Sequence, residues 1–331
     1  MTIVIDAMGG DHAPSEIVNG TLLAAPLVRG SLTLVGDPAR ITQACAGVMP
    51  PNVNVHPASQ VVEMDDKPID AIKQKKDSSL VVAVNLVKQG QGQAVVSAGN
   101  TGAATAASLL AWRQVPGVHR PAIASIFPCK GGQFILLDAG ASPDVDPAHL
   151  VEFALMGRAY ASRVLGKSSP KIHLLNIGEE PGKGNAFAKE AHDLLAKHDW
   201  FAGNIEGKDM FHEPCDVVVC DAFVGNIVLK TAEGVGEFIV DEIRSRVPTG
   251  PAKFLYLPLK RAMAPLKKKM DYAEYGGSPL LGLNGTMIIA HGRSNAKAIK
   301  NAVLLAAKAV ESGLVESIRD SFSAPRTAEE A

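Results

Sequence analysis

Residues 95–104 read VVSAGNTGAA, a buried-strand pattern that passes through a glycine into the start of a helix. The predicted strand ends at Ser97, and Gly99 frees the backbone after it. Asn100 or Thr101 can cap the helix that follows. A helix N-terminus offers unpaired N–H groups and the positive end of the helix dipole, so the pattern favours an anion-binding loop over an ordinary glycine turn. The residues that we expect to bind phosphate are Ser97, Gly99, Asn100, Thr101 and Gly102.

The same alternation of strand and helix extends along the chain. Short runs rich in Val, Ile and Leu predict strands at 2–5, 32–35, 53–56, 94–97, 123–127, 134–138, 171–177 and 216–220. The segments between and after them predict helices at 15–27, 70–89, 101–114, 147–165, 185–198, 229–247 and 295–312. The strands lack strict polar alternation, which is typical of strands covered on both faces. We therefore expect a three-layer α/β/α fold with a mainly parallel sheet, as a single domain over 1–320 followed by a disordered tail at 321–331.

The composition excludes several classes of protein. The chain has 331 residues, 47% apolar and 20% charged, which is typical of a globular protein. Lys+Arg number 33 and Asp+Glu 34, and this balance argues against a dedicated nucleic-acid binder. The four cysteines contain no CxxC pair, so a reducing compartment is the simpler interpretation. With no signal-peptide pattern and no apolar run long enough to span a membrane, we expect a cytoplasmic protein.

A second glycine loop follows the first predicted strand. It reads DAMGGD at 6–11, and its glycines allow backbone N–H groups to approach a ligand closely. In a parallel sheet, ligands bind beyond the carboxyl ends of the strands, where this loop lies. A tight strand–helix turn is the alternative interpretation. The residues that we expect to contact phosphate or substrate are Asp6, Gly9, Gly10 and Asp11.

Two further loops carry candidate catalytic side chains. Lys183 stands between two glycines in NIGEEPGKGN at 176–185, a sequence that does not match a P-loop. Its ammonium can neutralise a phosphate or a developing oxyanion. A solvated loop lysine is the alternative. Asp221 ends the strand in DVVVCDAFVGN, and Asn226 lies at the predicted start of the next helix. These two can orient a substrate or assist proton transfer, or they can be a turn residue and a cap. Cys220 continues the apolar strand, so we interpret it as a core residue.

The loop IAHGRSN at 289–295 precedes the last predicted long helix. His291 is a candidate acid or base, and a structural histidine is the alternative. Ser294 is expected to be a phosphate ligand or a helix cap. GxGxxG, HExxH and paired Cys/His spacings are missing from the sequence, so we predict no metal site and no organic cofactor.

A basic amphipathic segment at 252–270 follows the sequence PTGP. Its apolar residues recur at helical spacing beside six basic residues, a pattern that suits an anionic lipid surface or an acidic carrier protein. Packing in a dimer interface is the alternative. We predict a projecting helical hairpin at about 229–275. The contact residues expected in it are Leu255, Leu259, Lys260, Arg261, Lys267, Lys268 and Lys269.

An ordered set of motifs resembles a known family. In chain order they are DAMGGDHAP (6–14), SAGNTGA (97–103), RPA (120–122), LLDAGA (136–141), LLNIGEE (174–180), GNIEG (203–207), VVVCDAFVGN (217–226), GSPLLGLNG (277–285) and HG (291–292). Together they resemble the bacterial phosphate acyltransferase (PlsX) family. The chain departs from that pattern at Ser142, Ala222 and Arg293.

The resemblance implies that acyl-[acyl carrier protein] and inorganic phosphate give acyl phosphate and free carrier protein, in phospholipid synthesis and without a cofactor. It also implies a homodimer, and a fold similar to isocitrate and isopropylmalate dehydrogenases and to phosphotransacetylases. We expect the glycine loops to hold phosphate and Lys183 and Asn226 to stabilise the oxyanion. Asp221 would orient Lys183 or the phosphate, and His291 is a weaker candidate for protonating the thiolate. The basic segment predicts peripheral contact with an anionic membrane, or docking of the acidic carrier protein.

Three other functions remain as alternatives. A short-chain phosphotransacetylase that uses acyl-CoA would share the fold and the reaction type. A metal- and NAD-dependent decarboxylating dehydrogenase is disfavoured because the sequence lacks the cofactor and metal signatures. A non-catalytic membrane scaffold for lipid enzymes would need none of the candidate catalytic residues.

Overall fold

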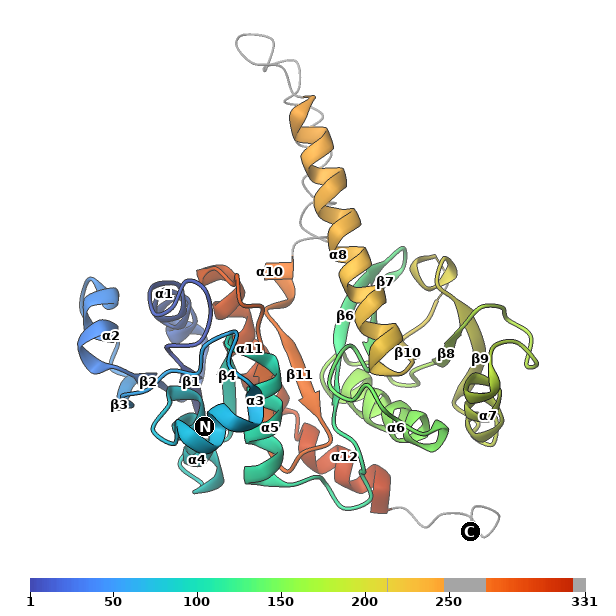
Figure 1. The fold of residues 1–331 in the computed structure, drawn as a ribbon, viewed down its shortest axis with the longest axis horizontal. Coiled ribbons are helices and arrows are strands. Elements are labelled where there is room, and N and C mark those ends of the chain that lie inside the picture. Colours follow the sequence, from blue (N-terminus) through green and yellow to red (C-terminus); the bar gives the residue numbers. More distant parts are fainter. Residues whose placement is uncertain (213, 247–271, 324–331) are drawn as a thin grey trace.

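The computed structural model describes residues 1–212, 214–246 and 272–323, and its strands form two sheets that lie side by side (Figure 1). In spatial order, the first sheet contains β3 (Val53–Pro57), β2 (Ser31–Gly36), β1 (Thr2–Asp6), β4 (Ala94–Ser97), β12 (Thr286–Ile289), β11 (Ser278–Leu281) and β5 (Ala122–Ile123). The second contains β6 (Ser125–Cys129), β7 (Gly132–Leu137), β10 (Val217–Val219), β8 (Ile172–Asn176) and β9 (Phe201–Glu206). Among the described strands, the antiparallel pairs are β12–β11, β11–β5 and β6–β7.

Both faces of the first sheet are buried, because alternate side chains of each strand enter different cores. Ile3 and Ile5 pack on one face, and Val4 packs on the other. The first face is covered by α1 (Ser15–Ala24), the short 3-10 helix η1 (Ala25–Leu27), α2 (Pro38–Cys45) and α11 (Ala296–Glu311). The second face is covered by α3 (Pro68–Gln74), α4 (Ser79–Lys88) and α5 (Thr101–Trp112).

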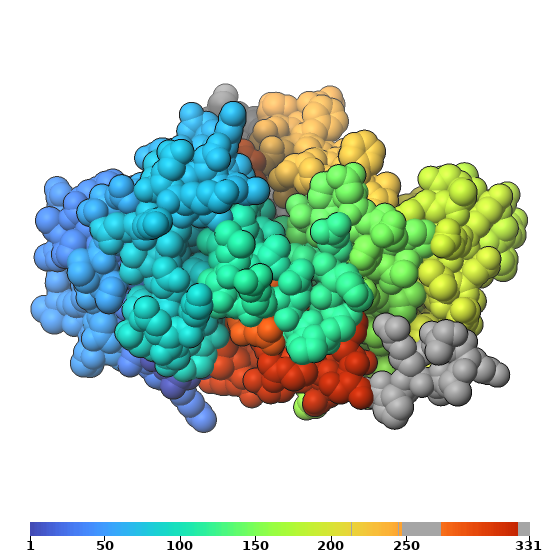
Figure 2. Space-filling view, turned by 60° about the horizontal axis from the view of Figure 1, so that its bottom comes forward, coloured from blue at the N-terminus to red at the C-terminus, as the bar shows by residue number. Residues whose placement is uncertain are grey.

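The second sheet is layered in the same way. One face is covered by α6 (Pro147–Arg163), α7 (Ala186–Leu195) and α12 (Leu314–Ser323). The other face is covered by the 3-10 helix η2 (Asp209–Phe211) and by the base of α8 (Ala222–Ser245). The short helix α10 (Tyr272–Tyr275) packs on α11. Figure 2 shows the C-terminal segment, in red, lying across the boundary between the blue and the yellow-green halves, where α12 packs on α6.

The predicted α/β fold with mainly parallel strands is confirmed, and each predicted strand is present, but the strands divide between two sheets. The predicted strand 123–127 is the crossing point, because β5 pairs with β11 in the first sheet and β6 pairs with β7 in the second. Strands β9, β11 and β12 and helices α2 and α12 were not predicted. Each is short or mixed in composition, so its apolar pattern is weak.

The helix boundaries differ from the prediction in three places. The segment 70–89 is two helices, because Ser78 caps a new helix through Val81 N–H. The helix predicted to begin at 229 begins at Ala222, where Asp221 accepts a hydrogen bond from Val224 N–H at 2.9 Å. Helix α12 extends to Ser323, so the first residues of the predicted tail are helical.

Helix α8 is the first arm of the predicted hairpin, and it projects away from both sheets (Figure 1). The return arm lies outside the described residues, and with it Leu255, Leu259, Lys260, Arg261, Lys267, Lys268 and Lys269. Among the described helices, none is long and apolar enough to cross a membrane.

Candidate active site

Three loops converge at the carboxyl edge of the first sheet, after the adjacent strands β1, β4 and β12. Asp11 N–H donates to Gly292 C=O at 2.9 Å, which joins the first loop to the third. A Cβ on Gly9 would lie 2.9 Å from Gly99 N, which places the first loop against the second. Gly10 has φ +108°, a conformation that favours glycine. The predicted glycine loops therefore form one continuous backbone surface.

Asp6 and Ser97 are the buried base of this surface. Ser97 Oγ donates to Asp6 Oδ2 at 2.7 Å, and Gly99 N–H donates to Ser97 Oγ at 3.2 Å. Asp6 is 2% exposed and Ser97 is 1% exposed. Burial raises the pKa of the Asp6 carboxyl above its usual value, against the lowering effect of its hydrogen bonds. Asp6 and Ser97, which were predicted as ligands, therefore hold the two glycine loops in position by buried hydrogen bonds.

The Asp6 carboxyl should make the stability of the protein pH-dependent. Because its pKa is higher in the folded chain than in the unfolded chain, the free energy of unfolding should fall as the pH rises from 3.8 through the folded pKa. Asp6→Asn removes this loss and keeps an acceptor for Ser97. We therefore expect the free energy of unfolding of Asp6→Asn, minus that of wild type, to increase as the pH rises from acid to neutral. Urea denaturation at several pH values measures this difference. A constant difference across that range would contradict the raised pKa.

Asn100 clamps the helix that starts at the second loop. Its Oδ1 accepts from Ala103 N–H at 3.0 Å, and its Nδ2 lies 3.0 Å from Met64 O and 3.1 Å from Asp66 O. The side chain is thus occupied by structure rather than directed to a ligand. The exposed Thr101 and Gly102 carry the first N–H groups of α5, which donate no hydrogen bond to the described residues. The N-terminus of α5 therefore keeps the donors that an anion needs.

The N-terminus of α11 is already occupied, which the sequence did not indicate. Asn295 caps the helix, and Ala296 N–H donates to the carboxylate of Glu16 at 2.5 Å. Ser294 is buried, and its Oγ has no hydrogen-bond partner among the described residues. Because Glu16 takes the place of an external anion, this geometry disfavours a phosphate at Ser294 itself.

His291 lies between the first sheet and α8. Burial is the main cause that lowers the pKa of its ring, and the positive charge of Lys230 lowers it further. The negative charges of Glu233 and Asp11 act in the opposite direction. The Nδ1 atom of His291 accepts from Arg293 N–H at 3.2 Å, and Arg293 in turn pairs with Glu237 of α8 at 3.1 Å. A ring with a lowered pKa is neutral at pH 7, so His291 is a hydrogen-bonding group rather than a ready acid.

The second sheet contributes a loop held by Asp138, at the end of β7. Its Oδ1 accepts from the N–H groups of Ile123, Gly140 and Ala141, each at 2.9 Å, and its Oδ2 accepts from Ser142 N–H at 2.8 Å. Because Ile123 belongs to the first sheet, this buried carboxylate joins the two sheets. Burial still raises its pKa above the usual value.

Asp221 immediately precedes α8 and Asn226 lies on its second turn, beside the Asp138 loop. The prediction that Asn226 begins the helix was wrong, because Asp221 is the residue that caps it. Asn226 is exposed, and a Cβ on Gly140 would lie 3.7 Å from its Oδ1. The amide makes no hydrogen bond to the described residues, and its Oδ1 lies beside Gly140, just after the end of β7.

Lys183 lies on the loop after β8, the strand next to β10. Parallel strands end at one edge, so this loop and Asp221 share the carboxyl edge of the second sheet. The Lys183 side chain is 49% exposed, with its ammonium 3.7 Å from the Glu180 carboxylate. A loose ion pair of this kind leaves the ammonium available to a ligand.

The two edges meet through α8 and the Asp138 loop. Ala139 is buried in one core cluster with Ala103 of α5 and Ile289 of β12, and Leu229 packs against the same cluster. The site residues of the two sheets therefore lie on either side of one junction.

Sequence reasoning missed Asp138 and Lys230. Asp138 follows a buried strand directly, which is the same sequence feature that singled out Asp221. Lys230 stands four residues after Asn226, and so on the same face of α8. Cys220 was interpreted correctly as a core residue: it is 3% exposed, and burial raises the pKa of its thiol. A buried thiol that resists ionisation is a poor nucleophile.

A cavity of about 440 Å³ lies elsewhere, between α6 and α12. Its lining is basic and rich in hydroxyls, and includes Arg158, Arg163 and Lys167. It contains none of the predicted site residues, so the convergence of loops, rather than this cavity, locates the chemistry.

Comparisons with known proteins identify the family and the fold. The model of a family described as "Fatty acid synthesis protein" matches residues 1–317. A phosphate acyltransferase of Desulfitobacterium hafniense is 48% identical over 323 residues, covering 96% of this chain and 97% of that protein. One of Geobacter sulfurreducens is 44% identical over 332 residues, covering 99% and 96%. A solved phosphotransacetylase from Streptococcus pyogenes matches with a TM-score of 0.64 at 17% identity over 94% of each chain, a likeness of fold alone.

Proposed function

The chain belongs to the fatty acid synthesis protein family, the bacterial phosphate acyltransferases (PlsX), and we propose that its acyl donor is acyl-[acyl carrier protein]. It is an acyltransferase with phosphate as the acceptor, in fatty acid and phospholipid synthesis. A phosphate oxygen attacks the thioester carbonyl, the C–O bond forms, and the C–S bond breaks. The carrier leaves as a thiolate, which then takes a proton. Such a reaction gains chiefly from holding two reactants in line and from stabilising the tetrahedral oxyanion.

Phosphate binds at the carboxyl edge of the first sheet in this proposal. The observation that carries it is the convergence of the 6–11 and 97–102 loops at the start of α5, with the N–H groups of Thr101 and Gly102 unused by the described residues. Backbone donors at a helix N-terminus bind phosphate without a metal ligand set. Asp6, Ser97 and Asn100 keep that backbone in place.

The acyl carbonyl lies toward the second sheet. Asn226 donates to the developing oxyanion, and Lys183 supplies the positive charge there or on phosphate. Asp221 caps the start of α8 and so holds Asn226 in position. We favour this role for Asp221 over a direct role in orienting Lys183. His291, neutral at pH 7, positions a reactant by a hydrogen bond rather than protonating the thiolate.

We also propose that the protein is a homodimer that packs through α8. The projecting helix carries an apolar stripe of Phe223, Ile227, Val235 and Phe238, which are 67%, 51%, 51% and 67% exposed. An exposed stripe of this size indicates a partner. Peripheral contact of the 252–270 segment with anionic lipid or carrier protein stays a prediction.

The stripe predicts the effect of one substitution. Phe238→Glu places a charge in the interface and should weaken the dimer at least about tenfold, because a buried unpaired charge costs several kcal/mol. Light scattering after size exclusion measures the mass. Leu110→Glu, at a residue 56% exposed on α5, is the matched control and should remain dimeric. A monomeric wild type that floats with anionic vesicles would assign the stripe to lipid instead.

The donor is tested by comparing acyl-[acyl carrier protein] with acetyl-CoA. Preference for acetyl-CoA would favour a short-chain phosphotransacetylase.

A further inference from the structure

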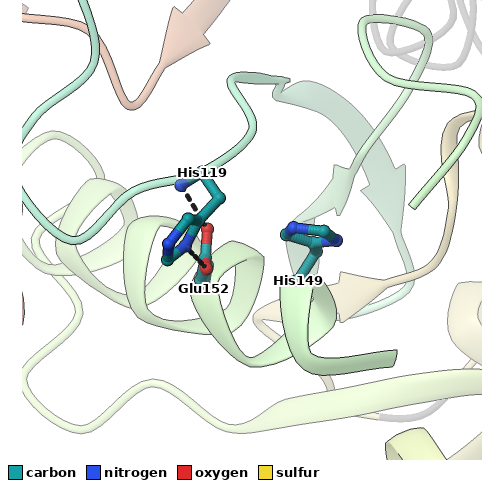
Figure 3. A group of neighbouring side chains, drawn as sticks. All are labelled: His119, His149 and Glu152. Atoms are coloured by element: carbon teal, nitrogen blue, oxygen red, sulfur yellow. Dashed lines mark hydrogen bonds and ion pairs between the residues drawn. The ribbon is translucent and has the colours of Figure 1, made fainter. Parts of the chain in front are cut away.

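His119, His149 and Glu152 form a cluster that contains none of the proposed site residues (Figure 3). His149 and Glu152 are three residues apart on α6 and so share one face of the helix. His119 comes from the segment that leads into β5. One potential ligand atom from each residue lies within 4.8 Å of the others.

Glu152 is a buried carboxylate whose only ion-pair partner among the described residues is His119, which carries charge only when its ring is protonated. Glu152 is 8% exposed, its Oε1 lies 2.6 Å from His119 Nδ1, and its Oε2 accepts from His119 N–H at 2.8 Å. Among the described lysines and arginines, none lies within ion-pair distance of it. A buried carboxylate of this kind is stabilised by a cation.

His149 is already oriented by the capping box at the start of α6. Its Nδ1 accepts from Asp146 N–H at 2.8 Å, and Asp146 Oδ2 lies 3.9 Å away. Because Nδ1 accepts, the ring proton lies on Nε2. A metal bound at Nε2 would move that proton to Nδ1, which replaces the bond from Asp146 N–H and requires the Asp146 carboxylate to approach from 3.9 Å to accept it. A carboxylate behind a metal-binding imidazole is a common arrangement of metal sites.

We propose that His119, His149 and Glu152 bind a divalent cation of the zinc class. Two imidazoles and one carboxylate suit Zn²⁺, and imidazole disfavours Mg²⁺ and Ca²⁺. With ligand bonds of about 2.1 Å, tetrahedral ligand atoms lie about 3.4 Å apart, so the separations in the cluster must shorten by up to about 1.4 Å. The His119 side chain, 67% exposed, is free to make that movement. The fourth position is left to water.

The cation would stiffen a segment that supports the Asp138 loop. Two residues beyond His119, Pro121 C=O accepts from Ser142 Oγ at 2.9 Å, and Ile123 N–H donates to Asp138. A cation that joins His119 to α6 would therefore hold the 119–123 segment at His119, while its hydrogen bonds to the Asp138 loop hold its other end. The inference concerns binding and stability, and it does not depend on the proposed donor.

The test uses the full, untagged chain after removal of bound metal, with Co²⁺ as a spectroscopic probe and Zn²⁺ in calorimetry. We expect one Co²⁺ per chain with the visible absorption of a four- or five-coordinate site, displaced by Zn²⁺, and a higher Tm with Zn²⁺. His119→Gln and Glu152→Gln should each weaken Zn²⁺ binding at least about tenfold and abolish the absorption band. His212→Gln, at an exposed histidine outside the cluster, is the control and should bind as wild type does.

Two results would overturn the proposal. One is a wild-type chain that gives no stoichiometric Co²⁺ band and no Zn²⁺ heat. The other is equal Zn²⁺ affinity in wild type, His119→Gln and His212→Gln. Circular dichroism verifies that the variants are folded, and His119→Gln, at a largely exposed side chain, should remain so.

Discussion

Replacing Lys183 or Asn226 by alanine should lower kcat about a hundredfold, the usual cost of losing one oxyanion donor. Both side chains are exposed at the edge of the second sheet. Lys183 makes only a loose contact with Glu180, and Asn226 leaves the capping of α8 to Asp221. Neither substitution should therefore change the free energy of unfolding by more than about 0.5 kcal/mol. Steady-state kinetics and urea denaturation measure the two quantities.

Two further variants separate the chemical role from a steric one. Lys189→Ala removes an exposed lysine on α7 and should leave kcat unchanged. Asn226→Asp keeps the shape of the side chain but replaces the N–H donor by a negative acceptor, so it should be at least as impaired as Asn226→Ala. Rates within threefold of wild type for both alanine variants would remove these residues from the mechanism.

Gly225→Ala should destabilise the protein by at least about 2 kcal/mol and impair catalysis strongly. A Cβ at this position would lie 1.9 Å from Asp138 C=O, so α8 must move away from the end of β7. That movement displaces Asn226, and a shift of about 1 Å at a catalytic group can cost about a hundredfold in rate. Thermal unfolding and kcat report the two effects.

Gly234→Ala on the same helix is the matched control. A Cβ there meets nothing within 4 Å, so the substitution should stabilise α8 by up to about 1 kcal/mol through helix propensity. If Gly225→Ala behaved like Gly234→Ala, the close packing of α8 against the Asp138 loop would be wrong.

The sequence identified the layers and most loops of the site, because buried strands and the glycines after them have a local signature. The 6–11 and 97–102 loops were predicted and lie together. What could not be predicted depends on contacts between distant segments. Glu16 occupies the N-terminus of α11, and Met64 and Asp66 accept from Asn100, across 280, 36 and 34 residues.

The division into two sheets was hidden for the same reason. A single apolar run at 123–127 contains both β5 and β6, and only their pairing with β11 and β7 separates them. The start of α8 was misplaced because the cap was expected at Asn226 and Asp221 was interpreted as an orienting or proton-transfer group or a turn residue, whereas the Asp221 carboxylate caps the helix. A sequence pattern cannot distinguish the two roles, since a cap and a catalytic acid use the same residue at the same place.

The most direct test of the central claim measures acyl phosphate formed from acyl-[acyl carrier protein] and inorganic phosphate, with acetyl-CoA as the competing donor. We expect acyl phosphate and free carrier thiol in equal amounts, a higher rate than with acetyl-CoA, and loss of the product in a Lys183→Ala, Asn226→Ala double variant. No acyl phosphate from the carrier-bound donor, or full activity in the double variant, would contradict it.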